Sequence, residues 1–250
     1  MRNPLSRVKH YIWRQSTRVL FRRPFEIRSD SGIVSFTFDD CPRSAFKVGG
    51  SVLERYKVSG TYYISFGLMA GGSPSGPIFI AEDLRQAVEQ GHELGCHTYS
   101  HCHSWDTPTR EFQDAIFKNA AALDKFLPGA RFESISYPIS EPRPAIKRTA
   151  GRHFRCCRGG GQSMNGGTAD LNQLYCYFLE RAHGDLASVQ KLIDKTMETR
   201  GWLIFATHDI DSTPSPFGCT PEFFEKVVQY ARGSGARVLP ISKALDSLSH

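Results

Sequence analysis

Four polar segments of the chain each follow an apolar run with the composition of a buried strand. Residues 37–40 read Thr-Phe-Asp-Asp, residues 97–101 His-Thr-Tyr-Ser-His, residues 136–139 Ser-Tyr-Pro-Ile and residues 206–209 Ala-Thr-His-Asp. They contain carboxylates and imidazoles, which bind divalent metal ions and transfer protons. If the fold places the four segments at one edge of a sheet, they could form a metal-dependent hydrolytic site.

The second segment contains the most specific spacing. His97 and His101 are four residues apart, and on one turn of helix they would lie on the same side, within reach of one cation. Two imidazoles with one carboxylate form a common site for zinc or a similar divalent ion. Asp39 and Asp40 are adjacent at the end of an expected strand, so their side chains point in different directions. One of them could hold the metal while the other has a second role.

Hydrolysis at such a site needs a base that takes a proton from water and an acid that protonates a leaving amine. Asp39 or Asp40 is the candidate base, and His208 is the candidate acid. Each also has a structural explanation, the Asp pair as a helix cap and His208 as a hydrogen-bonded core histidine. Their common position at strand ends favours the catalytic interpretation. Trp105, in a polar loop, is a candidate platform for a sugar ring, and Tyr137 is a second candidate substrate contact.

From Gly32 onward the chain alternates between strand-like and helix-like segments. The expected strands are 33–38, 61–66, 93–98, 134–139, 173–179, 202–207 and 237–241, and the expected helices are 44–58, 82–90, 108–127 and one that begins at Thr220-Pro221-Glu222. Such alternation implies parallel strands joined by right-handed crossovers. About seven or eight units in ~220 residues suit a (β/α) barrel, whose active site lies at the carboxyl ends of its strands. The sequence therefore predicts an α/β fold with a single barrel domain.

The composition is that of a globular protein. The 250 residues are 40% hydrophobic and 22% charged, and no uninterrupted apolar run is long enough to span a bilayer. The seven cysteines are an odd number without regular spacing, which argues against a disulfide framework and for a reducing compartment. These features argue against an integral membrane protein and predict a cytoplasmic one.

The net charge of +6 is concentrated in an N-terminal arm. Residues 1–25 contain seven of the 31 basic residues and no acidic residue, which leaves 24 basic against 25 acidic residues in the body. A nearly neutral body argues against nucleic-acid binding. Arginine and lysine interrupt the arm throughout, unlike a secretory signal. On a helical wheel one face of the arm is apolar, with Leu5, Val8, Ile12 and Val19.

We therefore expect a basic amphipathic arm over residues 1–28, followed by a domain of residues 29–250. Two interpretations of the arm stay open. Residues 1–23 adsorb to an anionic membrane surface, which would place the protein at the inner face of the membrane, or they pack as a helix across the outside of the domain.

The order of the motifs resembles that of the polysaccharide deacetylase family, the NodB-homology domain of carbohydrate esterase family 4. The resemblance rests on Thr37-Phe38-Asp39-Asp40, on His97-Thr98-Tyr99-Ser100-His101 and on Leu203-Ile204-Phe205-Ala206-Thr207-His208, and it covers about residues 32–245. It implies a distorted (β/α)7 barrel that removes acetyl groups from an N-acetylated sugar in a metal-dependent reaction. The sugar would be an oligosaccharide, a polysaccharide or a lipid-linked glycan precursor.

Carried over by position, the resemblance implies a role for each motif residue. Asp39 would be the catalytic base and His208 the catalytic acid. The metal, zinc with cobalt or nickel as alternatives, would be held by Asp40, His97 and His101. The backbone N–H of Ile139 would contribute to the oxyanion hole.

The chain also departs from the family pattern. Cys41 stands where the first motif has glycine, Ser136 where the third has an arginine that orients the base, and Ile139 where the third has tyrosine. No Asp–Trp pair that would tune the acid histidine occurs around residues 153–165. Arg143 is the candidate substitute for the missing arginine. Two other functions stay open, an amide hydrolase that cleaves a non-sugar C–N bond and a non-catalytic carbohydrate-binding protein.

Overall fold

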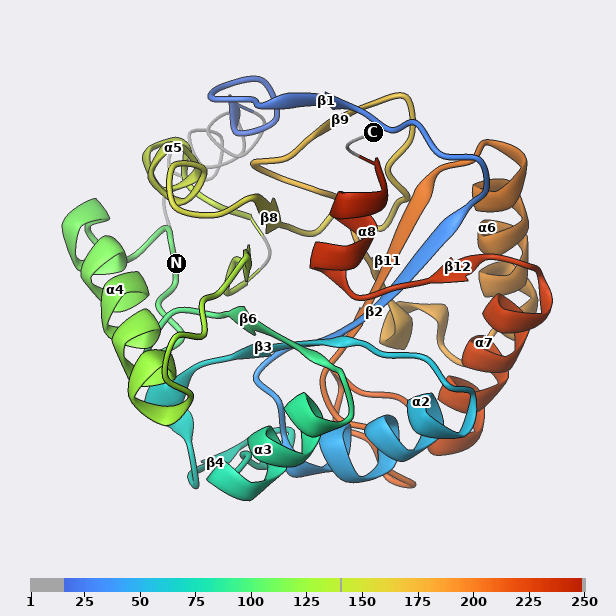
Figure 1. Cartoon of the computed structure of the whole chain (residues 1–250), viewed down its shortest axis with the longest axis horizontal. Helices are drawn as coiled ribbons and strands as arrows, with labels where there is room; N and C mark the ends of the chain where they lie inside the picture. Colours follow the sequence, from blue (N-terminus) through green and yellow to red (C-terminus); the bar gives the residue numbers. More distant parts are fainter. Residues whose placement is uncertain (1–15, 140, 249–250) are drawn as a thin grey trace, which may run out of the picture.

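One curved sheet of parallel strands forms the centre of the protein (Figure 1). The computed structural model describes residues 16–139 and 141–248. Its main strands are β2 (Ile33–Phe38), β3 (Thr61–Ile64), β6 (Glu93–Cys96), β7 (Ser134–Ser136), β8 (Cys156–Arg158), β10 (Tyr177–Phe178), β11 (Trp202–Thr207) and β12 (Arg237–Val238). Among these described residues the order is β10-β11-β2-β3-β6-β7-β8, with β12 paired to β2. The fold is the predicted distorted α/β barrel.

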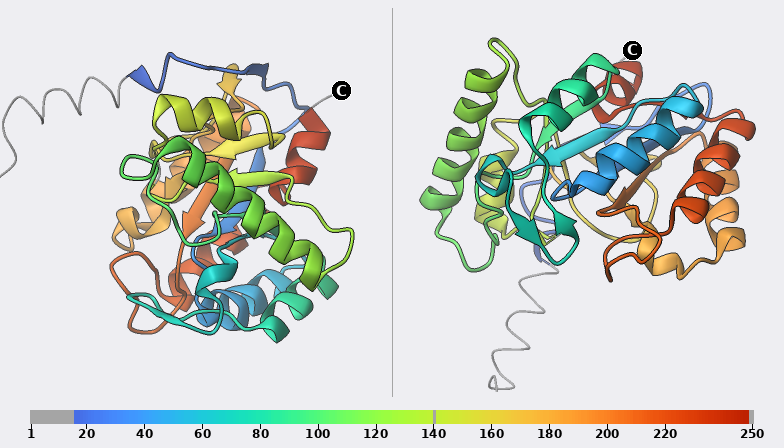
Figure 2. Two further views of the ribbon diagram at one scale, coloured as in Figure 1. Left: turned by 90° about the vertical axis from the view of Figure 1, so that its left-hand side faces the viewer. Right: turned by 90° about the horizontal axis from the view of Figure 1, so that it is seen from below.

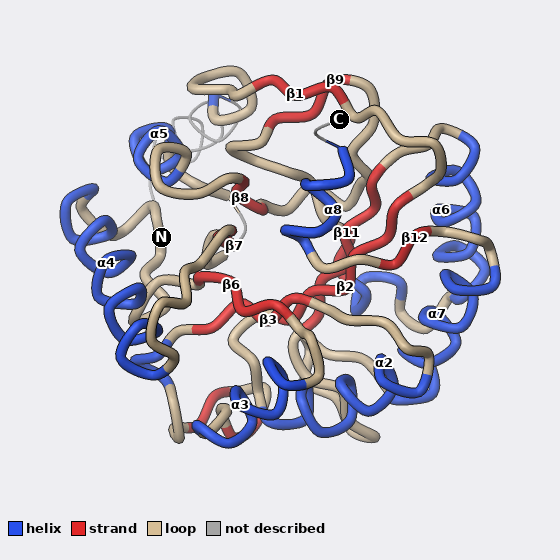
Figure 3. Tube along the Cα trace, in the orientation of Figure 1, coloured by secondary structure: helices blue, strands red, loops and turns tan. Residues whose placement is uncertain are grey.

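The sheet is curled, as Figure 3 shows, and among the described residues no strand pair joins β8 to β10. An irregular segment bridges this side. The Cys157 N–H donates to the Leu171 carbonyl over 2.7 Å, and the Leu174 N–H donates to the Cys157 carbonyl over 2.8 Å. These bonds pair the backbone N–H and carbonyl of Cys157 in β8 with the irregular segment in place of a strand, which distorts the barrel there.

Helices cover the outer side of the sheet, as Figures 1 and 2 show. They are the helical segment η1 (Ala45–Gly50), α2 (Ser51–Arg55), α3 (Ala81–Glu89), α4 (Thr109–Phe126), α5 (Pro144–Ala150), α6 (Leu186–Glu198) and α7 (Pro221–Gly233). The helix α8 (Ile241–Leu248) packs instead at the amino ends of the strands, where Ile241 N–H donates to Thr61 Oγ1 over 3.0 Å. Of the helices described, none is long and apolar enough to cross a membrane.

Side chains of the strands alternate between the helix side and the interior of the barrel, as the two-residue period of a strand requires. In β2, Phe36 and Phe38 pack on the helix side, whereas Ile33 packs inside with Trp202 of β11. Trp202 Nε1 donates to Ser35 Oγ over 2.9 Å, so its indole is part of the interior. This alternation decides which residues beyond the strand ends can face the interior.

Several expected strands are shorter in the structure, and the helices α5, α6 and α8 were not predicted. The strand expected over 173–179 is limited to Tyr177–Phe178, and the one over 237–241 to Arg237–Val238, because Pro240 has no N–H to continue a ladder. The short strand β8 was not predicted. Its three residues contain too little periodic signal to separate from the surrounding loop.

The described part of the N-terminal arm lies against the barrel. The strand β1 (Pro24–Glu26) pairs antiparallel with β9 (Thr168–Asp170), and Arg23 donates to the carbonyls of Gly151 and Phe154, each over 3.1 Å. Residues 17–21 form turns. Most of the helix expected over 1–23 lies outside the described residues, and the domain division at residue 28 stays a prediction.

One buried histidine at the amino end of β6 makes stability depend on pH. His92 precedes β6, its Nδ1 accepts the Gly60 N–H over 3.0 Å, and its ring packs edge-on to Tyr62. Burial lowers the pKa of His92 from 6.5 to about 4. The unfolded chain therefore binds a proton that the folded chain excludes, so stability falls as the pH drops from about 6.5 towards 4.

We predict that His92 contributes roughly 2 kcal/mol to the loss of stability between pH 7 and pH 4.5, at about 1.4 kcal/mol per pKa unit. Urea unfolding at both pH values should show that His92→Gln loses less stability on acidification than the wild type. His153→Gln, which changes an exposed histidine, is the control. An equal loss in wild type and His92→Gln would contradict the assignment.

Candidate active site

The polar segments at the strand ends meet in one cavity of about 680 Å³. The cavity is lined by Asp39 and Asp40 after β2, His97 and His101 after β6, and His208 after β11. Because all the main strand pairs are parallel, these ends share one edge of the sheet. With Ile139, which also lines the cavity, the structure brings together six of the residues that the sequence singles out.

Asp40, His97 and His101 form a compact group whose ligand atoms lie within 4.8 Å of one another. Asp40 Oδ1 is 3.5 Å from His97 Nε2 and 3.3 Å from His101 Nε2. That oxygen is buried, and within the described chain it has no hydrogen-bond partner. A buried oxygen of this kind beside two imidazole nitrogens fits a bound divalent cation.

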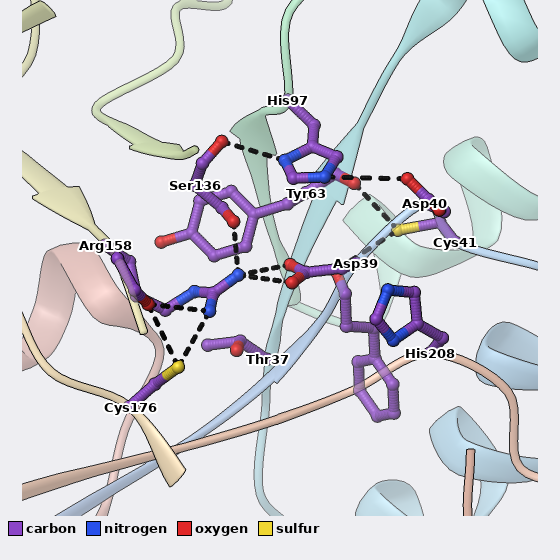
Figure 4. Close-up of polar contacts among 12 residues, drawn as sticks. Thr37, Asp39, Asp40, Cys41, Tyr63, His97, Ser136, Arg158, Cys176 and His208 are labelled. Atoms are coloured by element: carbon purple, nitrogen blue, oxygen red, sulfur yellow. Dashed lines mark hydrogen bonds and ion pairs between the residues drawn. The ribbon is translucent and has the colours of Figure 1, made fainter. Parts of the chain in front are cut away.

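The surroundings of His97 leave one of its ring nitrogens available to a metal ion. Its Nδ1 donates to the Ser136 carbonyl over 2.8 Å, which leaves the lone pair on Nε2 facing Asp40 (Figure 4). Burial lowers the pKa of His97 to about 4, although the nearby Asp39 acts in the opposite direction. The imidazole is therefore neutral near pH 7, the form that binds metal.

The path between the two histidines is a loop and not the helical turn that the spacing suggested. Thr98 and His101 have left-handed backbones, with φ of 60° and 53°. Thr98 Oγ1 accepts the Cys102 N–H over 2.9 Å and holds the loop. The four-residue spacing thus brings His101 close to His97 and Asp40 through a loop and not through a helical turn.

Asp39 faces the interior and forms a buried ion pair with Arg158, the last residue of β8 (Figure 4). The Arg158 guanidinium donates to both carboxylate oxygens of Asp39 and to Ser136 Oγ. Burial alone would raise the pKa of Asp39, but Arg158, with smaller contributions from His97 and His208, lowers it to about 2. Asp39 is therefore ionised at neutral pH and held in one orientation.

Arg158 was missed by the sequence analysis, and Arg143 was the wrong substitute. Arg143 lies before α5 and donates to the Thr107 carbonyl over 2.8 Å and to Thr109 Oγ1 over 3.3 Å, so it does not pair with Asp39. The signal for Arg158 was a charged residue directly after the apolar pair Cys156-Cys157, which repeats the pattern of the other strand ends.

His208 is oriented by a carbonyl group. Because a carbonyl oxygen only accepts, the 3.2 Å contact between His208 Nδ1 and the Phe217 carbonyl places a proton on Nδ1 and leaves Nε2 for other partners. A second unpredicted residue, Glu180, lines the same cavity, and its Oε2 is buried with no partner among the described residues. Burial raises the pKa of Glu180 to about 7, while the nearby His208 acts to lower it.

The remaining candidates have different surroundings. Ile139 lines the cavity and has a left-handed backbone with φ of 59°. Tyr137 is buried on the helix side of the sheet, where its hydroxyl donates to the Asn172 carbonyl over 3.0 Å. Trp105 Nε1 donates to the Glu141 carbonyl over 2.9 Å. Neither Tyr137 nor Trp105 lines the cavity, so the structure does not place these two as substrate contacts.

Comparisons with known proteins agree with this fold. Solved structures align with most of the chain, and three of them illustrate this. A family 4 acetyl xylan esterase from Clostridium thermocellum, in complex with a cobalt ion, is 20% identical over 86% of this chain and 90% of its own, with a TM-score of 0.61. The chitin deacetylase of the fungal pathogen Colletotrichum lindemuthianum is 14% identical over 88% and 89%, with a TM-score of 0.61. A pseudoenzyme of the same family from Bacillus anthracis is 11% identical over 89% and 68%, with a TM-score of 0.59.

At these identities the solved structures show the fold alone. A comparison with curated proteins finds no match. The family itself is shown by the sequence, because the model for the polysaccharide deacetylase family matches residues 27–153, more than half of the chain. The chain therefore belongs to the polysaccharide deacetylase family, as a deacetylase-type hydrolase of non-peptide carbon–nitrogen bonds.

Proposed function

We propose that the protein removes acetyl groups from an N-acetylated sugar, using a divalent metal ion bound by Asp40, His97 and His101. The observation that supports this most is the content of the cavity, which combines the three-ligand group, the arginine-paired Asp39 and His208. A metal site, an oriented carboxylate and an imidazole are the parts that hydrolysis of an unactivated amide requires.

A divalent ion in this site, zinc or alternatively cobalt or nickel, would supply Lewis-acid activation of water and of the acetyl carbonyl. Asp39, kept ionised by Arg158, accepts a proton from the attacking water. His208, protonated on both ring nitrogens, gives its Nε2 proton to the amide nitrogen, which leaves as an amine. The Ile139 N–H is the donor to the oxygen on which negative charge develops. The products are acetate and the free amino sugar.

The cavity walls also suit a sugar ring. They include the hydroxyl groups of Ser73 and Ser100 together with the rings of Phe178 and Phe217. Sugars present hydroxyl groups at their edges and apolar C–H faces, so mixed walls of this kind can bind both. This composition favours an acetylated sugar over the non-sugar amide that stayed open from the sequence.

Acetate release from acetylated chito-oligosaccharides, with zinc, cobalt, nickel or a chelator, tests the proposal. Acetate should appear with metal and stop with the chelator. A panel of cyclic amides separates the alternatives, since cleavage of these alone would indicate a different amide hydrolase. Sugar binding without any hydrolysis, in protein that contains metal, would indicate a non-catalytic carbohydrate-binding protein.

We infer a second partner, an anionic membrane surface, for the described end of the N-terminal arm. Residues 19–21 are Val, Leu and Phe, and their exposed fractions are 70%, 44% and 42%. The guanidinium of Arg148 lies 5.4 Å from the centre of the Phe21 ring. Exposed apolar side chains beside arginines, within residues 1–25 that contain no acidic residue, match the chemistry of anionic lipid headgroups.

We predict that the full chain sediments with phosphatidylserine-containing vesicles at low salt and is released at high salt. The double variant Leu20→Glu with Phe21→Glu should bind at least about tenfold more weakly, because burying the exposed 44% and 42% of these residues is worth about 1 kcal/mol each. Met69→Glu, at an exposed apolar residue of another loop, is the control. Binding that is equal in the double variant, or equal on neutral vesicles, would remove this partner.

A further inference from the structure

Arg158 and Ser136 occupy matching positions on neighbouring strands. β7 and β8 run parallel, and Ser136 lies directly opposite Arg158 in the register. Both side chains face the interior of the barrel, because their neighbours Ile135 and Cys157 pack on the helix side. Position 136 is where the resemblance leads one to expect an arginine. In this chain the arginine that reaches Asp39 therefore comes from β8, the strand next to β7, at the register position opposite Ser136.

The small side chain at position 136 is what lets Arg158 reach Asp39. Both residues are about 1% exposed, so no solvent separates them. Arg158 Nη2 donates to Ser136 Oγ and to the carboxylate of Asp39, so the guanidinium passes over Ser136 on its way to Asp39 (Figure 4). A longer side chain at 136 would occupy that path.

The rest of the guanidinium is held by backbone, sulfur and aromatic groups. Nη1 donates to the Gly159 carbonyl over 3.2 Å and to Cys176 Sγ over 2.9 Å. The guanidinium carbon lies 5.1 Å from the Tyr63 ring centre and 5.9 Å from that of Phe178. A buried cation is tolerated when such partners and an anion surround it, and a planar fork held on several sides has little freedom to turn.

We propose that Arg158 is the positioning residue for the catalytic base Asp39, and that positions 136 and 158 form one coupled unit with room for a single guanidinium. This inference rests on the proposed function for the role of Asp39. It makes Arg158 a residue that acts through Asp39 and does not touch the substrate, since Arg158 is absent from the cavity wall.

The coupling has a consequence for variants at the two positions. Arg158→Ser leaves the buried carboxylate of Asp39 without a cation, and Ser136→Arg places two guanidiniums beside one carboxylate. Each change should therefore be harmful alone. The double variant Ser136→Arg with Arg158→Ser restores one cation and one small side chain, so the effects of the two changes should be strongly non-additive.

The experiment compares the wild type, both single variants, the double variant and Arg158→Lys. Each single variant should lose at least about 100-fold in kcat on the acetylated oligosaccharide, with KM changed only a fewfold. The double variant should recover at least tenfold over the better single variant, and its urea midpoint should also exceed theirs. Arg158→Lys keeps the positive charge but loses the planar guanidinium with its several donors. Its kcat should therefore lie between those of Arg158→Ser and the wild type.

Arg155→Ser is the matched control for the loss of an arginine close by. Arg155 is exposed and pairs at the surface with Asp246 over 2.7 Å, so its kcat should stay near that of the wild type. Zinc affinity, measured by calorimetry, should change little in all variants, since the three ligands remain.

A double variant no better than the worse single variant, in both kcat and urea midpoint, would overturn the coupled unit. Near wild-type kcat in Arg158→Ser would overturn the positioning role. A wild type that releases no acetate would instead refute the proposed function, and with it the positioning role of Arg158. The urea midpoints of the four proteins would still decide the coupling.

Discussion

Asp40→Ala should lose metal binding and turnover together. Asp40 supplies the only carboxylate of the three-ligand group, and its Oδ1 lies 3.5 Å and 3.3 Å from the two imidazole nitrogens. With three protein ligands, the loss of one leaves two imidazoles, which hold a divalent ion weakly. We expect zinc affinity to fall by more than about 100-fold, beyond the effect of losing an outer hydrogen-bond partner.

Calorimetric titration of metal-free protein with zinc measures this directly, and acetate release at saturating metal measures turnover. Asp114→Ala, at an exposed position of α4, is the control and should match the wild type in both measurements. His97→Ala should behave like Asp40→Ala. Zinc binding of wild-type strength in Asp40→Ala would move the metal away from this group and would contradict the site as a whole.

The strand ends were predictable because each one is a local pattern. The run at 33–38 is apolar and β-branched and is followed at once by Asp39 and Asp40, and His208 follows the run at 202–207 in the same way. Parallel strands then place the polar residues at one edge without any knowledge of side-chain packing. The same reasoning explains why the sequence could place these candidate residues in one cavity.

The direction of side chains was harder to predict. Tyr137 follows Ser136, and in an extended segment neighbours point to opposite faces. Ser136 faces the interior, so Tyr137 packs on the helix side and cannot reach the cavity. Strict use of that alternation on the 134–139 run would have excluded Tyr137 as a substrate contact.

The arginine was not predictable because its position depends on register. Arg158 is 119 residues from Asp39, and the two meet only because β7 and β8 pair with Ser136 opposite Arg158. Strands of three residues carry no pattern that sets such a register. Arg143 was nearer to the third motif in sequence, but it lies before α5. Its guanidinium donates hydrogen bonds to Thr107 and Thr109 instead of Asp39.

The two adjacent aspartates should separate in their effects, which tests the mechanism. Asp39 is outside the three-ligand group and faces Arg158, so Asp39→Asn should bind zinc nearly as well as the wild type. Its turnover should fall by about 10² to 10⁴, the usual cost of removing a general base. Zinc titration and acetate release on the same preparation separate this result from that of Asp40→Ala.

Asp39→Asn also leaves the buried guanidinium of Arg158 without its anion, which can cost about 3–5 kcal/mol of stability. Two variants therefore accompany it. Asp83→Asn changes another buried aspartate, which pairs with Arg43 over 2.9 Å and does not line the cavity. It should lower the urea midpoint without a comparable loss of kcat. His208→Ala should retain metal and lose turnover, because an unprotonated amine is a poor leaving group.

Near wild-type turnover of Asp39→Asn at saturating zinc would place the base elsewhere, and Glu180 would be the next carboxylate to test. It lines the same cavity, and one of its oxygens is buried with no partner in the described chain. Burial raises its pKa to about 7, so it would be only partly ionised where Asp39 is fully so. If Asp39 is the base, Glu180→Gln should cost much less turnover than Asp39→Asn; the reverse order would assign the proton transfer to Glu180.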